Sequence, residues 1–139
     1  ASPTWSLVGS TTLTVNDTRP PTGVNSITPN PIDLASPPVS FTITGGGFAD
    51  LGFGLPVANF YNSGGTIIAQ ARATSGTNTS LTVPYPTNAT SVSGPKPGLS
   101  AGTLTVKVFN QTSASPTWSL VGSTTLTVND TRVAATGRK

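Results

Sequence analysis

Few side chains in this chain of 139 residues could take part in acid–base or metal chemistry. The sequence has no His, Cys or Met, and its four acidic residues are all Asp. Without His and Cys, the usual nucleophile–base arrangements are impossible and zinc lacks its common ligands. Asp33 and Asp50 could form a glycosidase acid–base pair, but scattered Asp residues are more typical of turns and do not supply the clustered oxygens that calcium needs. We therefore predict no enzyme activity, no metal site and no cofactor.

Aromatic side chains offer a second kind of chemistry, the stacking of a sugar ring. The candidates are Trp5, Tyr61, Tyr85 and Trp118. Trp118 falls on the apolar side of its expected strand, which favours packing in the core. Tyr85 lies between two prolines in an expected loop and is the better candidate for an exposed contact.

The tripeptide Asn-x-Ser/Thr, the acceptor of N-linked glycans in secreted eukaryotic proteins, occurs five times. Its positions are Asn16, Asn78, Asn88, Asn110 and Asn129. We take Asn78, Asn88 and Asn110 as candidate glycosylation sites. The tripeptide also arises often by composition in a chain with 25 Thr and 16 Ser, so that origin stays open.

The elements that would position these residues are strands. Thr and Val favour strands, and the 15 Gly and 13 Pro supply frequent turns. Alternating segments are expected at 24–27, 39–44, 56–61, 66–73, 80–83, 102–110 and 114–132. Seven or so short strands separated by turns predict an all-β fold, an immunoglobulin-like two-sheet β-sandwich.

One segment of 19 residues occurs twice. Residues 1–19 (the first copy) and 114–132 (the second copy) both read ASPTWSLVGSTTLTVNDTR. Such identity indicates either tandem units with a period of 113 residues or a segment copied to the other terminus. Each copy has the pattern of a strand with one apolar face, and Gly-Ser in its middle could bend or bulge it. The anchors on that face are Trp5, Leu7, Leu13 and Val15 in the first copy and Trp118, Leu120, Leu126 and Val128 in the second.

Several short motifs resemble the IPT/TIG family of immunoglobulin-like domains. They are Ile27-Thr28-Pro29, the run from Phe41 to Phe48 (FTITGGGF), Val57–Phe60, Ser80–Pro84 and Gly102–Val108. The resemblance implies the sandwich fold, as found in tandem repeats of bacterial surface or fibre proteins. The chain departs from the family by a longer loop over 84–101 and a long last strand. Family members that bind DNA do so through basic loops that this sequence does not match, so no functional residue is carried over.

The expected organisation has four parts. Residues 1–19 are a duplicated strand, 20–23 a Pro-rich linker, 24–132 the sandwich, and 133–139 a tail or the start of a next unit. One sandwich has room for one copy of the last strand. The other copy must belong to a preceding unit, to a neighbouring chain, or to no ordered structure.

We therefore predict a structural repeat module of an extracellular fibre, filament or giant adhesin, joined to its neighbours through the duplicated strand. A covalent tandem array and a strand-exchange polymer are both open, and a polysaccharide-binding or spacer module is the alternative function. The expected partner is the protein itself, with glycans as a further candidate. The seven basic residues are scattered, which argues against nucleic acid, and no apolar run is long enough to span a bilayer. The composition suits a secreted or cell-surface protein of bacterial origin.

Overall fold

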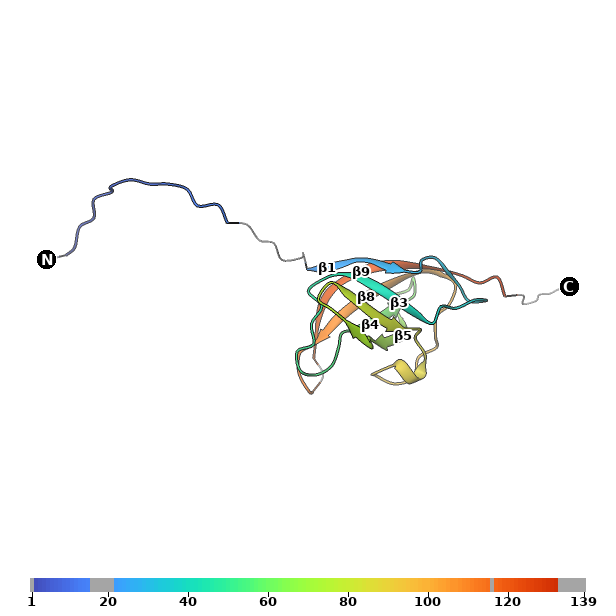
Figure 1. Ribbon diagram of the computed structural model, residues 1–139. Coiled ribbons are helices and arrows are strands. Elements are labelled where there is room, and N and C mark those ends of the chain that lie inside the picture. The colour runs from blue at the N-terminus through green and yellow to red at the C-terminus, as the bar shows by residue number, and fades with distance from the viewer. Residues whose placement is uncertain (1, 16–21, 116, 133–139) are drawn as a thin grey trace.

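The computed structural model describes residues 2–15, 22–115 and 117–132, and its sandwich is built from two facing sheets (Figure 1). The first sheet contains β1 (Gly23–Thr28), β3 (Ser40–Gly46), β7 (Ser80–Pro84) and β6 (Ser75–Gly76), in the order β1-β3-β7-β6. The second contains β2 (Ile32–Asp33), β9 (Trp118–Asn129), β8 (Gly102–Gln111), β4 (Val57–Tyr61) and β5 (Ile67–Arg72), in the order β2-β9-β8-β4-β5. A 3₁₀ turn, η1 (Asn88–Thr90), lies in the loop between β7 and β8.

This strand order is that of an immunoglobulin sandwich, in which the first strands divide between the two sheets. The all-β two-sheet prediction is confirmed. The chain crosses from β1 in one sheet to β2 in the other over a segment that contains Pro29 and Pro31. β1 begins at Gly23, which pairs with Gly46, so the sandwich starts one residue before the expected boundary.

The core fills the space between the sheets. In β3, Phe41 and Ile43 are fully buried while Thr42 between them is exposed, as the alternation predicts. Phe41 packs on Phe60 with ring centroids 5.8 Å apart. Phe48 turns back into the core after Gly47, whose φ of +85° favours glycine. The largest fully buried side chains also include Leu81, Val83, Leu104, Val106, Val108, Leu126 and Val128.

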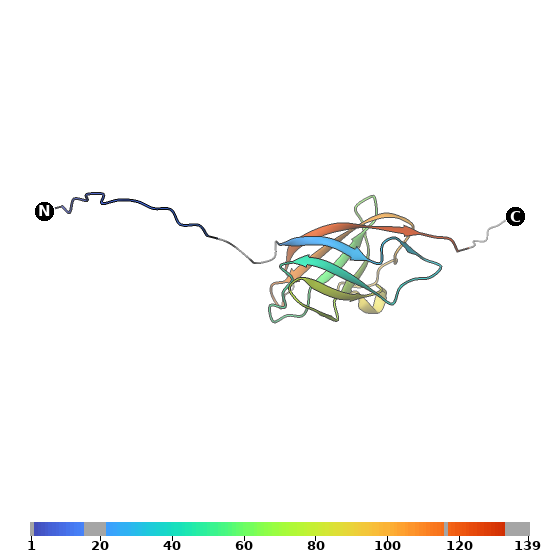
Figure 2. The ribbon, with the colours of Figure 1, turned by 45° about the horizontal axis from the view of Figure 1, so that its top comes forward.

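The sandwich has two ends, which we call the N-pole and the C-pole. The N-pole consists of the start of β1 and the segments 47–56, 73–79 and 112–117; the C-pole consists of 29–39, 62–66, 85–101 and 130–132. Figures 1 and 2 show β1 starting at one end and β9 finishing at the other. The chain therefore enters and leaves the sandwich at opposite poles.

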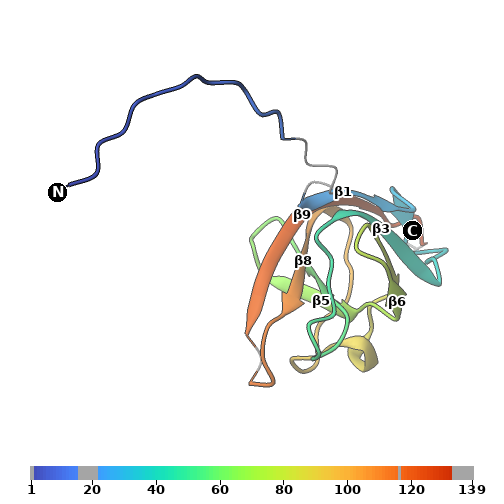
Figure 3. The same ribbon diagram turned by 60° about the vertical axis from the view of Figure 1, so that its left-hand side comes forward.

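The first copy lies outside the sandwich. Residues 2–15 form no strand, and the ribbon leads away from both sheets in all three views, most openly in Figure 3. The additional N-terminal strand expected from the sequence does not form within this single chain. The physical reason is that a strand needs a partner edge, and the matching position is already occupied by β9.

Candidate functional site: the position of the last strand

The second copy forms β9, the longest strand of the sandwich. It pairs with β8 from Gly102–Val128 to Gln111–Trp118, and its end also pairs in parallel with β2 through Ile32–Val128 and Asp33–Asn129. Leu126 and Val128 are fully buried in the core. The second copy is thus an integral strand, held by a backbone ladder along nearly its whole length.

A bulge divides β9 into two halves that face opposite ways. Val108 pairs with Gly122 but Phe109 pairs with Leu120, which leaves Val121 as the extra residue on β9. The inward-facing parity therefore changes at this point, and Val121 is buried with an exposed fraction of 8%. Val121 is a core residue that strict alternation misses, although the neighbouring Gly-Ser is a sequence signal for a bulge.

The prediction that Trp118 and Leu120 anchor the strand in the core is therefore wrong for this sandwich. Their exposed fractions are 37% and 54%, and both lie on the outer face of the five-stranded sheet. The physical reason is a close approach of the two sheets. A Cβ on Gly122 would lie 2.6 Å from the backbone nitrogen of Val24, so the bare backbone must face β1 at this position.

Side chains from the β1–β2 segment close the free edge of β9. The Asn30 side-chain amide donates to the Thr125 carbonyl oxygen at 3.0 Å and accepts from the Thr127 backbone nitrogen at 3.0 Å, as a neighbouring strand would. Asp33 accepts from the backbone nitrogen of Thr131 at 3.1 Å and from its hydroxyl at 2.7 Å. Hydrogen bonds from the backbone of Ala35 and from Thr131 hold the pKa of Asp33 below its ordinary 3.8.

In the described part of the first copy, the apolar side chains equivalent to those of β9 are exposed. The exposed fractions are 91% for Trp5, 84% for Leu7, 86% for Leu13 and 79% for Val15. Val8, the equivalent of buried Val121, is also fully exposed. In β9, the residues that enter the core correspond to Val8, Leu13 and Val15, so these three are the anchors that any host sheet would bury.

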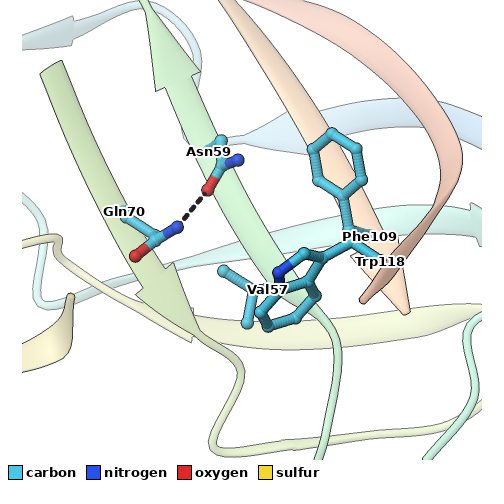
Figure 4. Close-up of a pocket in the computed structure, with 5 residues that line it drawn as sticks. All are labelled: Val57, Asn59, Gln70, Phe109 and Trp118. Carbon is cyan, nitrogen blue, oxygen red and sulfur yellow. Dashed lines mark hydrogen bonds between the residues drawn. The ribbon is translucent and has the colours of Figure 1, made fainter. Parts of the chain in front are cut away.

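Trp118 lies over a shallow hollow on the outer face (Figure 4). Val57, Asn59, Gln70 and Phe109 complete the lining of this space of about 110 Å³. The Arg72 guanidinium carbon is 5.9 Å from the Trp118 ring centroid, within the range of a cation–π contact. Arg72 also donates to the Gln111 side-chain oxygen at 2.8 Å. The indole is thus held against the sheet while part of its face remains exposed.

The other aromatic candidates lie apart from Trp118. Tyr85 is half-buried, because its ring stacks on Phe41 with centroids 6.2 Å apart, and burial raises its pKa. The expectation of a freely exposed Tyr85 is therefore only partly met. Tyr61 is on the same outer face as Trp118, where the Lys107 ammonium lies 4.9 Å from its ring centroid.

The three candidate glycosylation sites differ in their surroundings. Asn78 and Asn88 are exposed, although the Asn88 side-chain oxygen accepts from the Lys96 backbone nitrogen at 2.8 Å. The Asn110 amide nitrogen donates to the Gly47 carbonyl oxygen at 3.0 Å, so the atom that would carry a glycan is engaged. Asn16 lies outside the described residues.

The three carboxylates in the described residues, Asp33, Asp50 and Asp130, have structural surroundings and do not converge. Asp33 is at the C-pole, whereas Asp50 is in the N-pole loop, where it accepts from the backbone nitrogens of Gly52 and Gly54 at 2.9 and 3.3 Å. Asp130 forms a salt bridge with Arg132 at 2.8 Å. No group of three or more His, Cys, Asp or Glu residues able to hold a metal ion occurs in the part of the chain that the structure describes. Asp33 and Asp50 therefore cannot act as an acid–base pair within one sandwich.

Comparisons with known proteins add little to these observations. No protein-family model and no curated protein matches the chain. A solved structure that is similar is the crystal structure of CopC from Methylosinus trichosporium OB3b, with a TM-score of 0.46, 17% sequence identity, and coverage of 80% of this chain and 96% of that chain. At this level the likeness carries no argument about function, and the resemblance to IPT/TIG domains stays a prediction. Among the described residues, no helix has the length and apolarity that crossing a bilayer would require.

Proposed function

We propose that the chain is a structural repeat unit of an extracellular bacterial fibre or giant surface protein, and that successive units form a covalent tandem array. In this array the first copy is the last strand of the preceding unit. The supporting observation is that the second copy completes the sandwich, whereas the described part of the identical first copy has no place in it. Cohesion between units, and no catalytic step, is then the role of the chain.

The identity of the two copies favours the array over a strand-exchange polymer. If the first copy of one molecule replaced β9 of another, an identical strand would take the place of an identical strand, and no core contact would be gained. Association of two molecules costs an estimated 4–15 kcal/mol in lost freedom of motion. With no gain to offset that cost, full-length chains have no driving force to exchange strands.

The positions of the two ends of the sandwich also favour a linear array. The chain enters at the N-pole and leaves at the C-pole, so each added unit extends the array in the same direction (Figure 2). A heterologous, head-to-tail connection of this kind gives an open filament wherever the rotation between units does not close a ring.

Light scattering after size-exclusion chromatography separates the two arrangements. We expect the chain 1–139 and a chain lacking residues 1–19 both to be monomers. Oligomers formed by 1–139 and abolished by the deletion would show strand exchange and overturn this part of the proposal. A peptide map of the intact parent protein tests the array itself, since the 19-residue segment must occur in several copies per chain.

Polysaccharide binding is the second candidate, and the half-exposed indole of Trp118 beside the Asn59 amide favours it. An aromatic face next to a polar side chain is suited to stacking on a sugar ring while bonding its hydroxyls. A Trp5→Phe chain leaves Trp118 as the sole indole, so its fluorescence during titration with a panel of glycans reports on this face. A saturable change that Asn59→Ala weakens would support binding, and an unchanged spectrum across the panel would refute it.

A further inference from the structure

The exposed apolar side chains of the sandwich gather at one end. Among the described residues outside the first copy, six large apolar side chains are exposed: Val39, Leu51, Phe53, Val92, Trp118 and Leu120. Leu51 and Phe53 lie in the N-pole loop 47–56, and Trp118 and Leu120 lie on the outer face at the adjoining start of β9; we call these four residues the N-pole patch. Clustered apolar side chains on an otherwise polar surface mark an interaction site more often than scattered ones do.

The loop that carries Leu51 and Phe53 is held in place by polar contacts. The Asn110 side chain bonds both the Gly47 carbonyl oxygen and the Ala49 backbone nitrogen, at 3.0 and 3.1 Å. At the other end of the loop, Arg72 donates to the Leu55 carbonyl oxygen at 2.7 Å and lies against the Trp118 ring. The loop is thus fixed to β8 and β5, so a partner would meet an already ordered surface with little further entropy to lose.

The duplicated segment indicates the residue at which a preceding unit in the array would end. Arg19 is the equivalent of Arg132, which lies at the C-pole of a finished sandwich. Three residue steps separate Arg19 from Thr22, and an extended chain spans at most about 3.6 Å per residue, or about 11 Å in all. The residue equivalent to Arg132 in a preceding unit therefore lies within about 11 Å of Thr22, and the end of its β9, equivalent to Asn16, lies within about 22 Å, so the two poles are held close together.

Thr22 in turn lies directly beside the N-pole loop. A Cβ on Gly47 would come within 2.9 Å of the Thr22 side chain, so the incoming chain passes over the base of the loop that presents Leu51 and Phe53. The preceding C-pole is thereby brought to the patch. That pole presents Val39, whose exposed fraction is 92%, next to half-buried Tyr85, whose backbone nitrogen donates to the Val39 carbonyl oxygen at 3.0 Å.

We propose that the N-pole patch of each unit packs against the C-pole of the unit before it, around Leu51 and Phe53 on one side and Val39 on the other. This inference rests on the proposed tandem array and adds to it a fixed junction. The array is then a stiff rod with coupled neighbours, and not a string of independently moving domains. Because β9 alone has 12 residues at about 3.3 Å each, the rise per unit is on the order of 40 Å.

A two-unit chain made of residues 20–132 joined twice tests the junction. The Arg132–Pro20 join recreates the Arg19–Pro20 sequence, and residues 22–132 contain every strand of the sandwich, so each unit is complete. We expect NMR relaxation to show both units tumbling as one elongated body. Coupling should also raise the melting temperature above that of one unit, by about 5 °C.

The matched control is the same double substitution in the other unit. Leu51→Ser with Phe53→Ser in the second unit should separate the tumbling of the two units and abolish the rise in melting temperature. The same pair in the first unit, whose N-pole has no predecessor, should leave both measurements unchanged; circular dichroism checks that each variant is folded. Independent tumbling of the unsubstituted chain, or equal effects of the substitutions in both units, would overturn the junction while leaving the array standing. A parent protein with only one sandwich of this kind would instead overturn the array.

Discussion

The first and second copies of the 19-residue segment have one sequence and two structures. In the second copy Leu126 and Val128 are buried and the backbone is paired along β8, whereas Leu13 and Val15 of the first copy are exposed and lie in no strand. Local propensity is the same for both, so the difference comes entirely from the neighbouring edge of β8 and the core beneath it. This segment therefore forms a strand only where a sheet offers a free edge for backbone pairing.

The largest expected effect comes from deleting residues 114–132, which removes β9 and leaves the first copy as the sole replacement. In the vacated position, Asn16 would stand where Asn129 stands. Gly23 lies beside Gly122. Gly122 is seven residues before Asn129 along β9, so Gly23 is about 23 Å from the position of Asn129. The seven residue steps from Asn16 to Gly23 reach at most about 25 Å, so the chain could double back over this distance only if it were almost fully extended, which disfavours insertion within one chain.

We therefore expect the deleted chain to be unfolded when dilute and to form head-to-tail polymers when concentrated, as each first copy fills a neighbour's empty position. Circular dichroism and light scattering over a range of concentrations check this. A folded monomer at low concentration would contradict the account, because it would show that the first copy reaches its own sandwich.

Truncating the same leucine in each copy gives the next largest effect. Leu126→Ala should lower the free energy of unfolding by about 3–5 kcal/mol, since it leaves a cavity in a fully buried site. Leu13→Ala, the matched control, should change it by less than about 0.5 kcal/mol. Urea denaturation of the two variants measures both values, and equal losses would mean that both copies are buried.

A smaller effect distinguishes the two faces of β9 at the bulge. Val121→Ala should cost about 1–3 kcal/mol because Val121 is buried, whereas Leu120→Ala should change stability by less than about 0.5 kcal/mol because Leu120 is exposed. The same urea experiment applies. The reverse order would restore the strict alternation that the sequence suggests.

This bulge marks the limit of what the sequence could predict. The strands and the two-sheet fold follow from local alternation, as in Phe41-Thr42-Ile43, and from the turns between segments. The side of the sheet on which Trp118 lies does not follow from this alternation, because the extra residue in β9 reverses which side chains face the core. That extra residue is needed where Gly122 passes β1, a contact between residues far apart in the chain. For the same reason the sequence does not reveal how close Tyr85 lies to the core, since its stacking on Phe41 is a tertiary contact.

The Asn30 side chain tests whether hydrogen bonds at the free edge of β9 stabilise the second copy. Asn30→Ala removes two hydrogen bonds to the backbone of β9, and we expect a loss of about 1–2 kcal/mol in unfolding free energy. Thermal unfolding measures the loss. Ser63→Ala, in the exposed turn between β4 and β5, is the surface control and should be neutral. Equal stability of the Asn30 variant and this control would show that the free edge of β9 needs no such closure.

The smallest effect concerns pH. Hydrogen bonds from Ala35 and Thr131 lower the pKa of Asp33 below 3.8, so its stabilising contribution is present above pH 3.8 and is lost as the pH falls below that value through the folded-state pKa. Asp33→Asn should flatten the acid limb of a plot of melting temperature against pH. An unchanged acid limb would show that the contacts at Asp33 do not stabilise the end of β9.

Hydrogen exchange in the intact chain shows whether the second copy alone is held in a sheet. We expect slow exchange at the backbone amides of Leu126 and Val128 and immediate exchange at those of Leu13 and Val15, at every protein concentration. Equal protection of both copies would contradict this expectation, because the first copy would then occupy a sheet in another molecule and the units would be joined by exchanged strands.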